Sequence, residues 1–144
     1  DGDGDLDILF ANVQLFVDGA DPQNRLLIND GTGVFTDETA ARLPTDSARA
    51  LDGDLVDLDA DGDLDMITSN VTLPDAGIRN APYETFENDG RGTFTAAAWL
   101  PASATGRGLD SEAADLNGDG RVDLYLSSRG TVDRLLVGRT PDTP

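Results

Sequence analysis

The sequence predicts an all-β fold built from repeated four-stranded antiparallel units, and three observations support this. An acidic motif recurs at a shift of 58 positions, which separates Asp57 from Asp115. A short apolar segment follows each copy, as expected for a strand that is covered on both faces. An Asn-Asp-Gly-x-Gly segment lies between copies and predicts a hairpin, because its glycines can adopt positive φ. We therefore expect sheets stacked face to face.

The acidic motif has the form Asp-x-[Asp/Asn]-x-Asp-Gly-x-x-Asp. It reads DLDADGDLD at residues 57–65 and DLNGDGRVD at residues 115–123, and residues 1–7 repeat it without its first two positions. The hairpin segment reads NDGTGVFT at residues 29–36 and NDGRGTFT at residues 88–95. Repeats of this length decide the architecture of a chain, because each one corresponds to a single supersecondary unit.

The expected strands are short and rich in branched and aromatic residues. About four fall in each repeat. No segment predicts a stable helix, because the best candidate, Thr95 to Leu100, is short and ends at Pro101. The expected strands are Leu6 to Val13, Arg25 to Ile28, Val34 to Asp37, Ala50 to Val56, Leu64 to Val71, Gly108 to Ala114 and Val122 to Ser127.

The acidic loops predict calcium sites. Clustered carboxylates repel one another, and a divalent cation turns that repulsion into attraction. Calcium accepts six to eight oxygen ligands at irregular angles, which suits the loop better than the octahedral shell of magnesium.

We expect two complete calcium sites and one partial site. In the second loop the expected ligands are the side chains of Asp57, Asp59, Asp61 and Asp65 and the carbonyl of Asp63. In the third loop they are the side chains of Asp115, Asn117, Asp119 and Asp123 and the carbonyl of Arg121. The partial first loop offers Asp1, Asp3, Asp7 and the carbonyl of Asp5. Asn117 removes one carboxylate, so we expect the third site to be the weaker of the two complete sites.

An EF-hand or dockerin-type loop shares the first six positions of this motif. Such a loop requires a bidentate acid at position 12, where this chain has Thr68 and Leu126. The segments after the loops also predict strands rather than helices. The motif therefore favours a loop between strands.

With these motifs the chain resembles the FG-GAP/VCBS repeats found in the propellers of integrin α-subunits and in bacterial secreted proteins. The resemblance covers essentially the whole chain and implies a calcium-binding β-propeller with four strands in each blade. It implies one array over residues 1–144, with a partial blade at 1–47, a full blade at 48–105 and a partial blade at 106–144. About two and a half blades make an incomplete propeller.

Composition limits the functions that this chain can have. The 28 acidic and 10 basic side chains give a net charge of −18, which argues against a nucleic-acid partner. Cysteine and histidine do not occur, which excludes disulfides, thiol nucleophiles and the commonest general base. No segment has the roughly 20 apolar residues of a membrane helix. Calcium sites of this kind fill at extracellular calcium concentrations, so we expect a secreted or cell-surface location.

The expected function is a non-enzymatic scaffold, or a module that binds a protein or glycan ligand. One alternative is a subunit of a surface filament, a homo-oligomer or polymer in which one chain completes the blade of another. A second alternative is a fragment of a propeller-based polysaccharide lyase or hydrolase. Such an enzyme would use acid pairs such as Asp52 with Asp54 or Asp110 with Glu112. Both pairs follow the repeat, which favours a structural role.

Three further residue types carry weaker signals. Asn70 begins an N-glycosylation sequon, Asn70-Val71-Thr72. Trp99 lies in an irregular apolar stretch, where filling the core is more common than binding a sugar. Arg25 and Arg134 occur at equivalent positions, which predicts salt bridges or loop packing for both.

Overall fold

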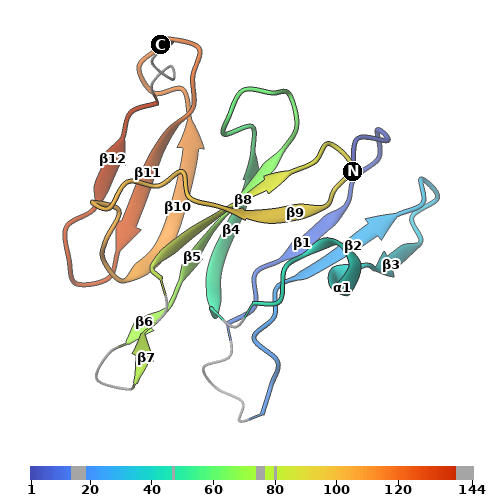
Figure 1. The fold of residues 1–144 in the computed structure, drawn as a ribbon, viewed down its shortest axis with the longest axis horizontal. Coiled ribbons are helices and arrows are strands. Elements are labelled where there is room, and N and C mark those ends of the chain that lie inside the picture. Colours follow the sequence, from blue (N-terminus) through green and yellow to red (C-terminus); the bar gives the residue numbers. More distant parts are fainter. Residues whose placement is uncertain (14–18, 47, 74–76, 80, 139–144) are drawn as a thin grey trace.

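The computed structural model describes residues 1–13, 19–46, 48–73, 77–79 and 81–138, and these residues form three main antiparallel sheets. The sheets follow one another along the chain (Figure 1). The first sheet contains β1 (Ile8–Phe10), β2 (Arg25–Asn29) and β3 (Phe35–Asp37). The middle sheet contains β4 (Ala50–Val56), β5 (Asp65–Asn70), β8 (Tyr83–Asn88) and β9 (Phe94–Ala97). The third sheet contains β10 (Gly108–Ala114), β11 (Asp123–Ser128) and β12 (Arg134–Leu136).

Two small elements lie outside these sheets. The helix α1 (Thr39–Arg42) follows β3, and the hairpin of β6 (Thr72–Leu73) and β7 (Ile78–Arg79) follows β5. Neither was expected from the sequence. The helix has four residues, too few for a periodic pattern. Its Arg42 lies in the last turn, where a positive charge suits the helix dipole.

Each main sheet is a meander in which neighbouring strands are antiparallel. The acidic loops connect β4 to β5 and β10 to β11, and the hairpins with Asn-Asp-Gly connect β2 to β3 and β8 to β9. Gly31, Gly33, Gly90 and Gly92 all have positive φ, between 74° and 86°. The expected hairpins are therefore confirmed, with the backbone conformation that only glycine adopts at low cost.

The sheets pack against one another through two apolar clusters. Leu26 and Ile28 of the first sheet pack with Met66, Phe86 and Phe94 of the middle sheet. On the other side of the middle sheet, Ile67 and Tyr83 pack with Leu124 and Leu126 of the third sheet. All six residues of β5 are buried, as expected for a strand that is covered on both faces.

The structure confirms an all-β fold of antiparallel sheets. The bounds of β4 and β10 match the expected segments, and β1 is shorter than expected. No helix forms at Thr95 to Leu100, in agreement with the sequence; its first three residues belong to β9, where Phe94 and Ala96 pair with Asn88 and Phe86 across the hairpin. The number of blades, and the division at residues 47 and 105, stay predictions.

Candidate metal centre

Three carboxylates of the second acidic loop converge on one point. A ligand oxygen from each of Asp57, Asp59 and Asp61 lies within 4.8 Å of the others, and no other group of three acidic side chains is this close among the described residues. Asp57 Oδ1 is buried and has no hydrogen-bond partner. Buried oxygens without a partner are costly, and a cation would satisfy this one. An all-oxygen donor set of this kind fits calcium.

Backbone turns hold these carboxylates in place. The N–H of Asp61 donates to Asp59 Oδ1 at 3.1 Å, the N–H of Asp63 donates to Asp61 Oδ1 at 2.9 Å, and that of Gly62 donates to Asp57 Oδ2 at 3.2 Å. Gly62 has φ of 101°, so the sharp turn needs a glycine there. The loop is shaped by its own hydrogen bonds, which leave the remaining lone pairs of the carboxylates for a cation.

Asp65, the last residue of the second motif, lies deeper than the other three. It is fully buried, its Oδ2 accepts from the N–H of Leu58 at 2.9 Å, and its Oδ1 accepts from the N–H of Asn88 at 3.0 Å. Each oxygen keeps a second lone pair, so a ligand role for Asp65 stays a prediction. The role that the structure gives it is to join the acidic loop to the end of β8.

The third loop repeats this arrangement with one difference. Asp115 accepts from the N–H groups of Gly118, Asp119 and Gly120, and Asn117 Oδ1 accepts from the N–H of Asp119. Asp123 is buried and accepts from the N–H of Leu116 at 3.0 Å and of Gly138 at 2.9 Å. The guanidinium of Arg121 lies 3.3 Å from Asp119 Oδ2 and competes there with a cation.

The partial first loop keeps the same local turns. The N–H of Asp5 donates to Asp3 Oδ1 at 3.1 Å, and Asp7 Oδ1 accepts from the N–H of Asn29 at 2.9 Å. The α-amino group of Asp1 donates to Asp7 Oδ2, and Arg42 lies 3.4 Å from Asp1 Oδ2. Arg42 also contacts Glu38 and the carbonyl of Arg91. The repeat does not predict this cation, because shifts of 58 and 59 positions from Arg42 lead to Leu100 and Pro101.

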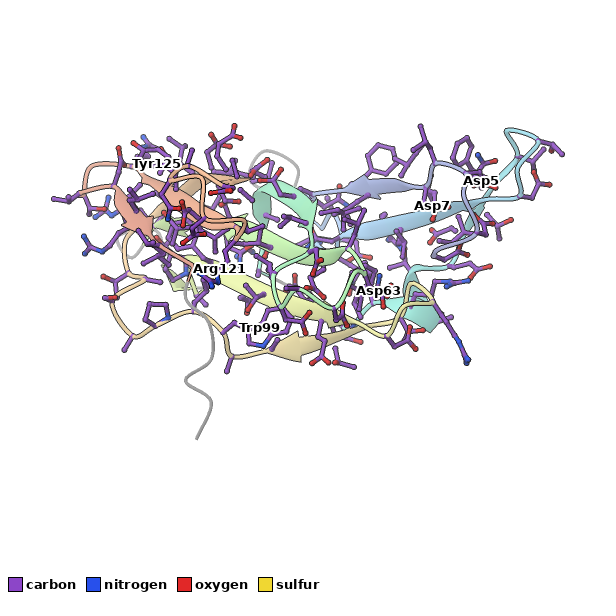
Figure 2. The ribbon with its side chains drawn as sticks, turned by 90° about the horizontal axis from the view of Figure 1, so that it is seen from above. Asp5, Asp7, Asp63, Trp99, Arg121 and Tyr125 are labelled. Carbon is purple, nitrogen blue, oxygen red and sulfur yellow. The ribbon has the colours of Figure 1, made fainter. Side chains whose placement is uncertain are left out.

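The three acidic loops are separate in space. Figure 2 shows the labelled residues Asp5, Asp63 and Arg121 of the three loops spread along the long axis of the molecule. Any cation bound in one loop therefore has its own ligands.

The hairpin at residues 88–95 contacts the second acidic loop through a hydrogen bond and through close packing. Asn88 Nδ2 donates to the carbonyl of Leu64 at 2.9 Å, while its Oδ1 accepts from the N–H groups of Gly90 and Gly92. The Asp63 carboxylate packs directly against Gly90, where a Cβ would collide with it. This contact explains why the hairpin and the acidic loop recur together.

The electrostatics of the loops follow from these contacts. Partial burial, and the charges of Asp61, Asp65 and Asp57, raise the pKa of Asp59 above its ordinary value. In the third loop the N–H of Gly120, with other backbone donors, lowers the pKa of Asp115. Desolvation and the neighbouring carboxylates therefore disfavour the charged form of Asp59, and a bound cation would offset this.

The acid pairs proposed as catalytic candidates lie where the middle and third sheets meet. Asp52 Oδ2 accepts from both the N–H and the hydroxyl of Ser111 at 3.1 Å. Partial burial, with the charges of Asp52, Glu112 and Asp110, raises the pKa of Asp54 to about 6. These contacts give Asp52 a role in joining two sheets.

A cavity of about 600 Å³ lies between the middle and third sheets. It is bordered by Trp99, Leu100 and four consecutive residues from Leu135 to Gly138. Consecutive residues of a strand point to opposite faces, so the backbone edge of β12 borders the cavity. Among the residues that the structure describes, no Asp or Glu lines it. Trp99 is 38% exposed, so it fills the core only in part.

The weaker sequence signals have structural explanations. Arg25 forms salt bridges with Asp21 at 2.7 Å and with Asp37 at 3.8 Å. Arg134 Nε donates to the carbonyl of Ser103 at 2.7 Å, which is the expected loop packing. Asn70 is fully buried and its amide donates to other groups of the protein, although it begins a sequon.

No helix in the described part of the chain has the length and apolar character needed to cross a membrane. No curated protein and no solved structure matches the chain significantly. A family model described as an FG-GAP-like repeat matches residues 1–68 and 77–126, which is most of the sequence. The repeated loops, hairpins and antiparallel sheets agree with that match, and the chain belongs to the FG-GAP-like repeat family.

Proposed function

We propose that this chain is a calcium-stabilised, non-enzymatic binding module of the β-propeller type that works outside the cytoplasm. The observation that carries the proposal is the cluster of Asp57, Asp59 and Asp61, with its buried and unpartnered oxygen on Asp57. The family match supports a binding module, because FG-GAP repeats form propeller-like folds. The ligand is a protein or a glycan that contacts the loops at the sheet ends.

The extracellular location follows from the expected affinity. Calcium modules of extracellular proteins bind with Kd of about 10⁻⁴ to 10⁻³ M. At 1 mM calcium, such a site stabilises the folded state by about 0.4 to 1.4 kcal/mol. At submicromolar cytosolic calcium the sites would be almost empty. Bound calcium would also reduce the net charge of −18, which opposes the compact state through self-repulsion.

A structural role for the acid pairs supports a non-enzymatic function. Asp52 Oδ2 accepts two hydrogen bonds from Ser111 of the neighbouring sheet, which gives this carboxylate a structural contact between the sheets. The described residues that line the 600 Å³ cavity are mostly apolar and include no acid. A glycosidase needs two carboxylates on opposite sides of the bond that is cleaved.

The test compares two variants that each remove one negative charge. Asp59→Asn changes the cluster, whereas Asp21→Asn changes an exposed acid that pairs with Arg25 far from the acidic loops. We expect calcium titration by calorimetry to show one binding event fewer for Asp59→Asn than for wild type, and no change for Asp21→Asn. Thermal unfolding in 1 mM calcium and in chelator checks the linkage. Equal calcium binding by all three proteins would refute the proposal.

A further inference from the structure

Two buried oxygen atoms lie between the first and middle sheets, at the end of β5 that is far from the acidic loop. Thr68 is 1% exposed and Asn70 is 0% exposed. Both follow Met66 in steps of two, so they point as it does toward the first sheet. Thr68 Oγ1 and Asn70 Oδ1 have no hydrogen-bond partner in the part of the chain that the structure describes. Buried oxygens of this kind are costly and indicate a ligand outside the protein.

Two carboxylates lie beside these oxygens. Glu84 is the cross-strand partner of Thr68, so their Cβ atoms are about 4.5 to 5.5 Å apart. Its Oε2 accepts from Asn70 Nδ2 at 2.7 Å. Asp46, in the loop that leads from the first sheet to β4, accepts from the buried Asn24 at 3.2 Å. Burial, and next the charge of Asp46, raise the pKa of Glu84, although the bond from Asn70 opposes them. The two acids therefore repel each other.

The described residues do not compensate this repulsion with a salt bridge. All the salt bridges found among them involve other acids than Asp46 and Glu84. Arg49 leads into β4, but its charge is not among the causes that shift the pKa of Glu84. The site therefore combines two acids with two unpartnered oxygens, which is a donor set for a cation.

The repeat shows which residue type usually takes the position of Glu84. Arg134 takes it in the third sheet and Arg25 in the first, because their cross-strand partners are 58 positions from that of Glu84. Arg134 donates to the carbonyl of Ser103, in the loop between the middle and third sheets. Asp46 lies in the equivalent loop between the first and middle sheets. The third sheet thus has a positive charge between strand and loop, where the middle sheet has two acids.

We propose that a divalent cation binds between Asp46 and Glu84, in the place of the guanidinium that Arg134 supplies in the third sheet. Thr68 Oγ1 and Asn70 Oδ1 are its neutral ligands, and water fills the remaining positions. Two carboxylates balance the charge of one divalent ion, and a donor set made only of oxygen favours calcium over softer metals. The ion joins the loop before β4 to β8.

This site is separate from the acidic loops. The second acidic loop ends at Asp65, where β5 begins, whereas Asn70 is the last residue of β5 (Figure 1). The two sites share no ligand, so each can be removed without changing the other. The proposal therefore does not depend on calcium binding by the acidic loops.

The experiment titrates the protein with calcium chloride by calorimetry. Glu84→Gln removes one ligand charge and keeps the shape of the side chain, so it should show one binding event fewer than wild type. Asp46→Asn should lose the same event from the other side of the site. Glu87→Gln makes the same change as Glu84→Gln at an exposed position of the same strand, and it should bind calcium as wild type does.

Thermal unfolding distinguishes a lost ion from a damaged fold. In chelator at pH 7.5, Glu84→Gln should melt no lower than wild type, because it removes an acid whose charged form is disfavoured by burial and by Asp46. Calcium at 1 mM should then raise the melting temperature of wild type by more than that of Glu84→Gln, because only wild type gains from this ion. An equal increase in both proteins would count against the site.

A further variant, Asp59→Asn, distinguishes this site from the second acidic loop. The double variant with Glu84→Gln should lose two binding events. If Asp59→Asn loses an event and Glu84→Gln does not, the present proposal is wrong and the acidic-loop site stands. If only Glu84→Gln loses an event, the present proposal stands and the acidic-loop site is wrong. Wild type that binds no calcium would overturn both, and a loss of equal size in Glu87→Gln would overturn this site by showing a general effect of charge.

Discussion

Asp65 Oδ1 accepts a hydrogen bond from the backbone N–H of Asn88 at 3.0 Å, which ties the start of β5 to the end of β8 across the middle sheet. Asp7 and Asn29 make the same bond in the first sheet at 2.9 Å, and Asp123 and Gly138 make it in the third at 2.9 Å. The last acid of each motif therefore has a structural role that does not need a cation.

This bond predicts a stability effect in the absence of metal. In Asp65→Asn, the amide NH₂ replaces one carboxylate oxygen and faces one of the two backbone N–H groups that donate to Asp65. Loss of a hydrogen bond to a charged group lowers the free energy of unfolding by about 1.5 to 3 kcal/mol. Denaturant unfolding in chelator should show this loss. Asp61→Asn, in the exposed part of the loop, should show none under the same conditions. If the two variants have equal stability in chelator, Asp65 acts only as a ligand.

The contact between Asp63 and Gly90 predicts a second difference. Gly90→Ala must adopt a positive φ of 74° and also displace the Asp63 carboxylate. Gly33→Ala, in the equivalent hairpin, has φ of 86° and no atom within 4 Å of the new Cβ. The left-handed conformation alone costs about 1 to 2 kcal/mol. Gly90→Ala should therefore lower the melting temperature more than Gly33→Ala, and only Gly90→Ala should weaken calcium binding. Equal effects in both hairpins would contradict the packing described for Asp63.

Asp54 predicts a pH dependence with a defined sign. Its pKa is raised from 3.8 to about 6 in the folded state, so between these values the folded state binds more protons than the unfolded state. Asp54 therefore makes folding less favourable as pH rises from about 4 to above 6. In chelator, Asp54→Asn should be more stable than wild type at pH 7.5, and the difference should shrink toward pH 4.5. A difference that stays constant over this range would exclude the raised pKa.

The buried position of Asn70 predicts that a host which glycosylates sequons leaves this residue unmodified in the folded protein. Its side chain is fully buried, and Asn70 Nδ2 donates to Glu84 Oε2 at 2.7 Å and to the carbonyl of Ala81 at 3.1 Å. A glycan replaces one of the two N–H hydrogens of this nitrogen, so at least one of these bonds would be lost, and the fully buried side chain leaves no room for a sugar. Folded, secreted protein should therefore have the unmodified mass by intact mass spectrometry. Folded protein that carries a glycan at Asn70 would show that this part of the sheet rearranges.

Much of the fold could be predicted because it repeats. The bounds of β4 and β10, the two hairpins and the burial of β5 follow from turn chemistry and from the apolar pattern. The short helix α1 and the hairpin of β6 and β7 could not be predicted, because each is too short for its period to show and neither repeats.

The candidate site was predictable in its residue types and less so in their roles. Asp57, Asp59 and Asp61 converge as the loop pattern implies. The pattern does not distinguish an acid that faces a cation from one that accepts backbone hydrogen bonds, so the position of Asp65 needed the structure. The ion pair of Arg42 with Asp1 joins residues 41 positions apart and has no counterpart in the repeat.

The meander gives the two ends of each sheet different freedom to vary. Acidic loops and Asn-Asp-Gly hairpins share one end, where each depends on the other, as the bond between Asn88 and Leu64 shows. The connections from β1 to β2, from β5 to β8 and from β11 to β12 leave from the opposite end (Figure 1). They differ widely in length, because they span residues 11–24, 71–82 and 129–133. Mutation and insertion can therefore diversify that end without disturbing the acidic loops, much as variable loops change on a fixed immunoglobulin framework. Libraries aimed at new binding specificities belong there.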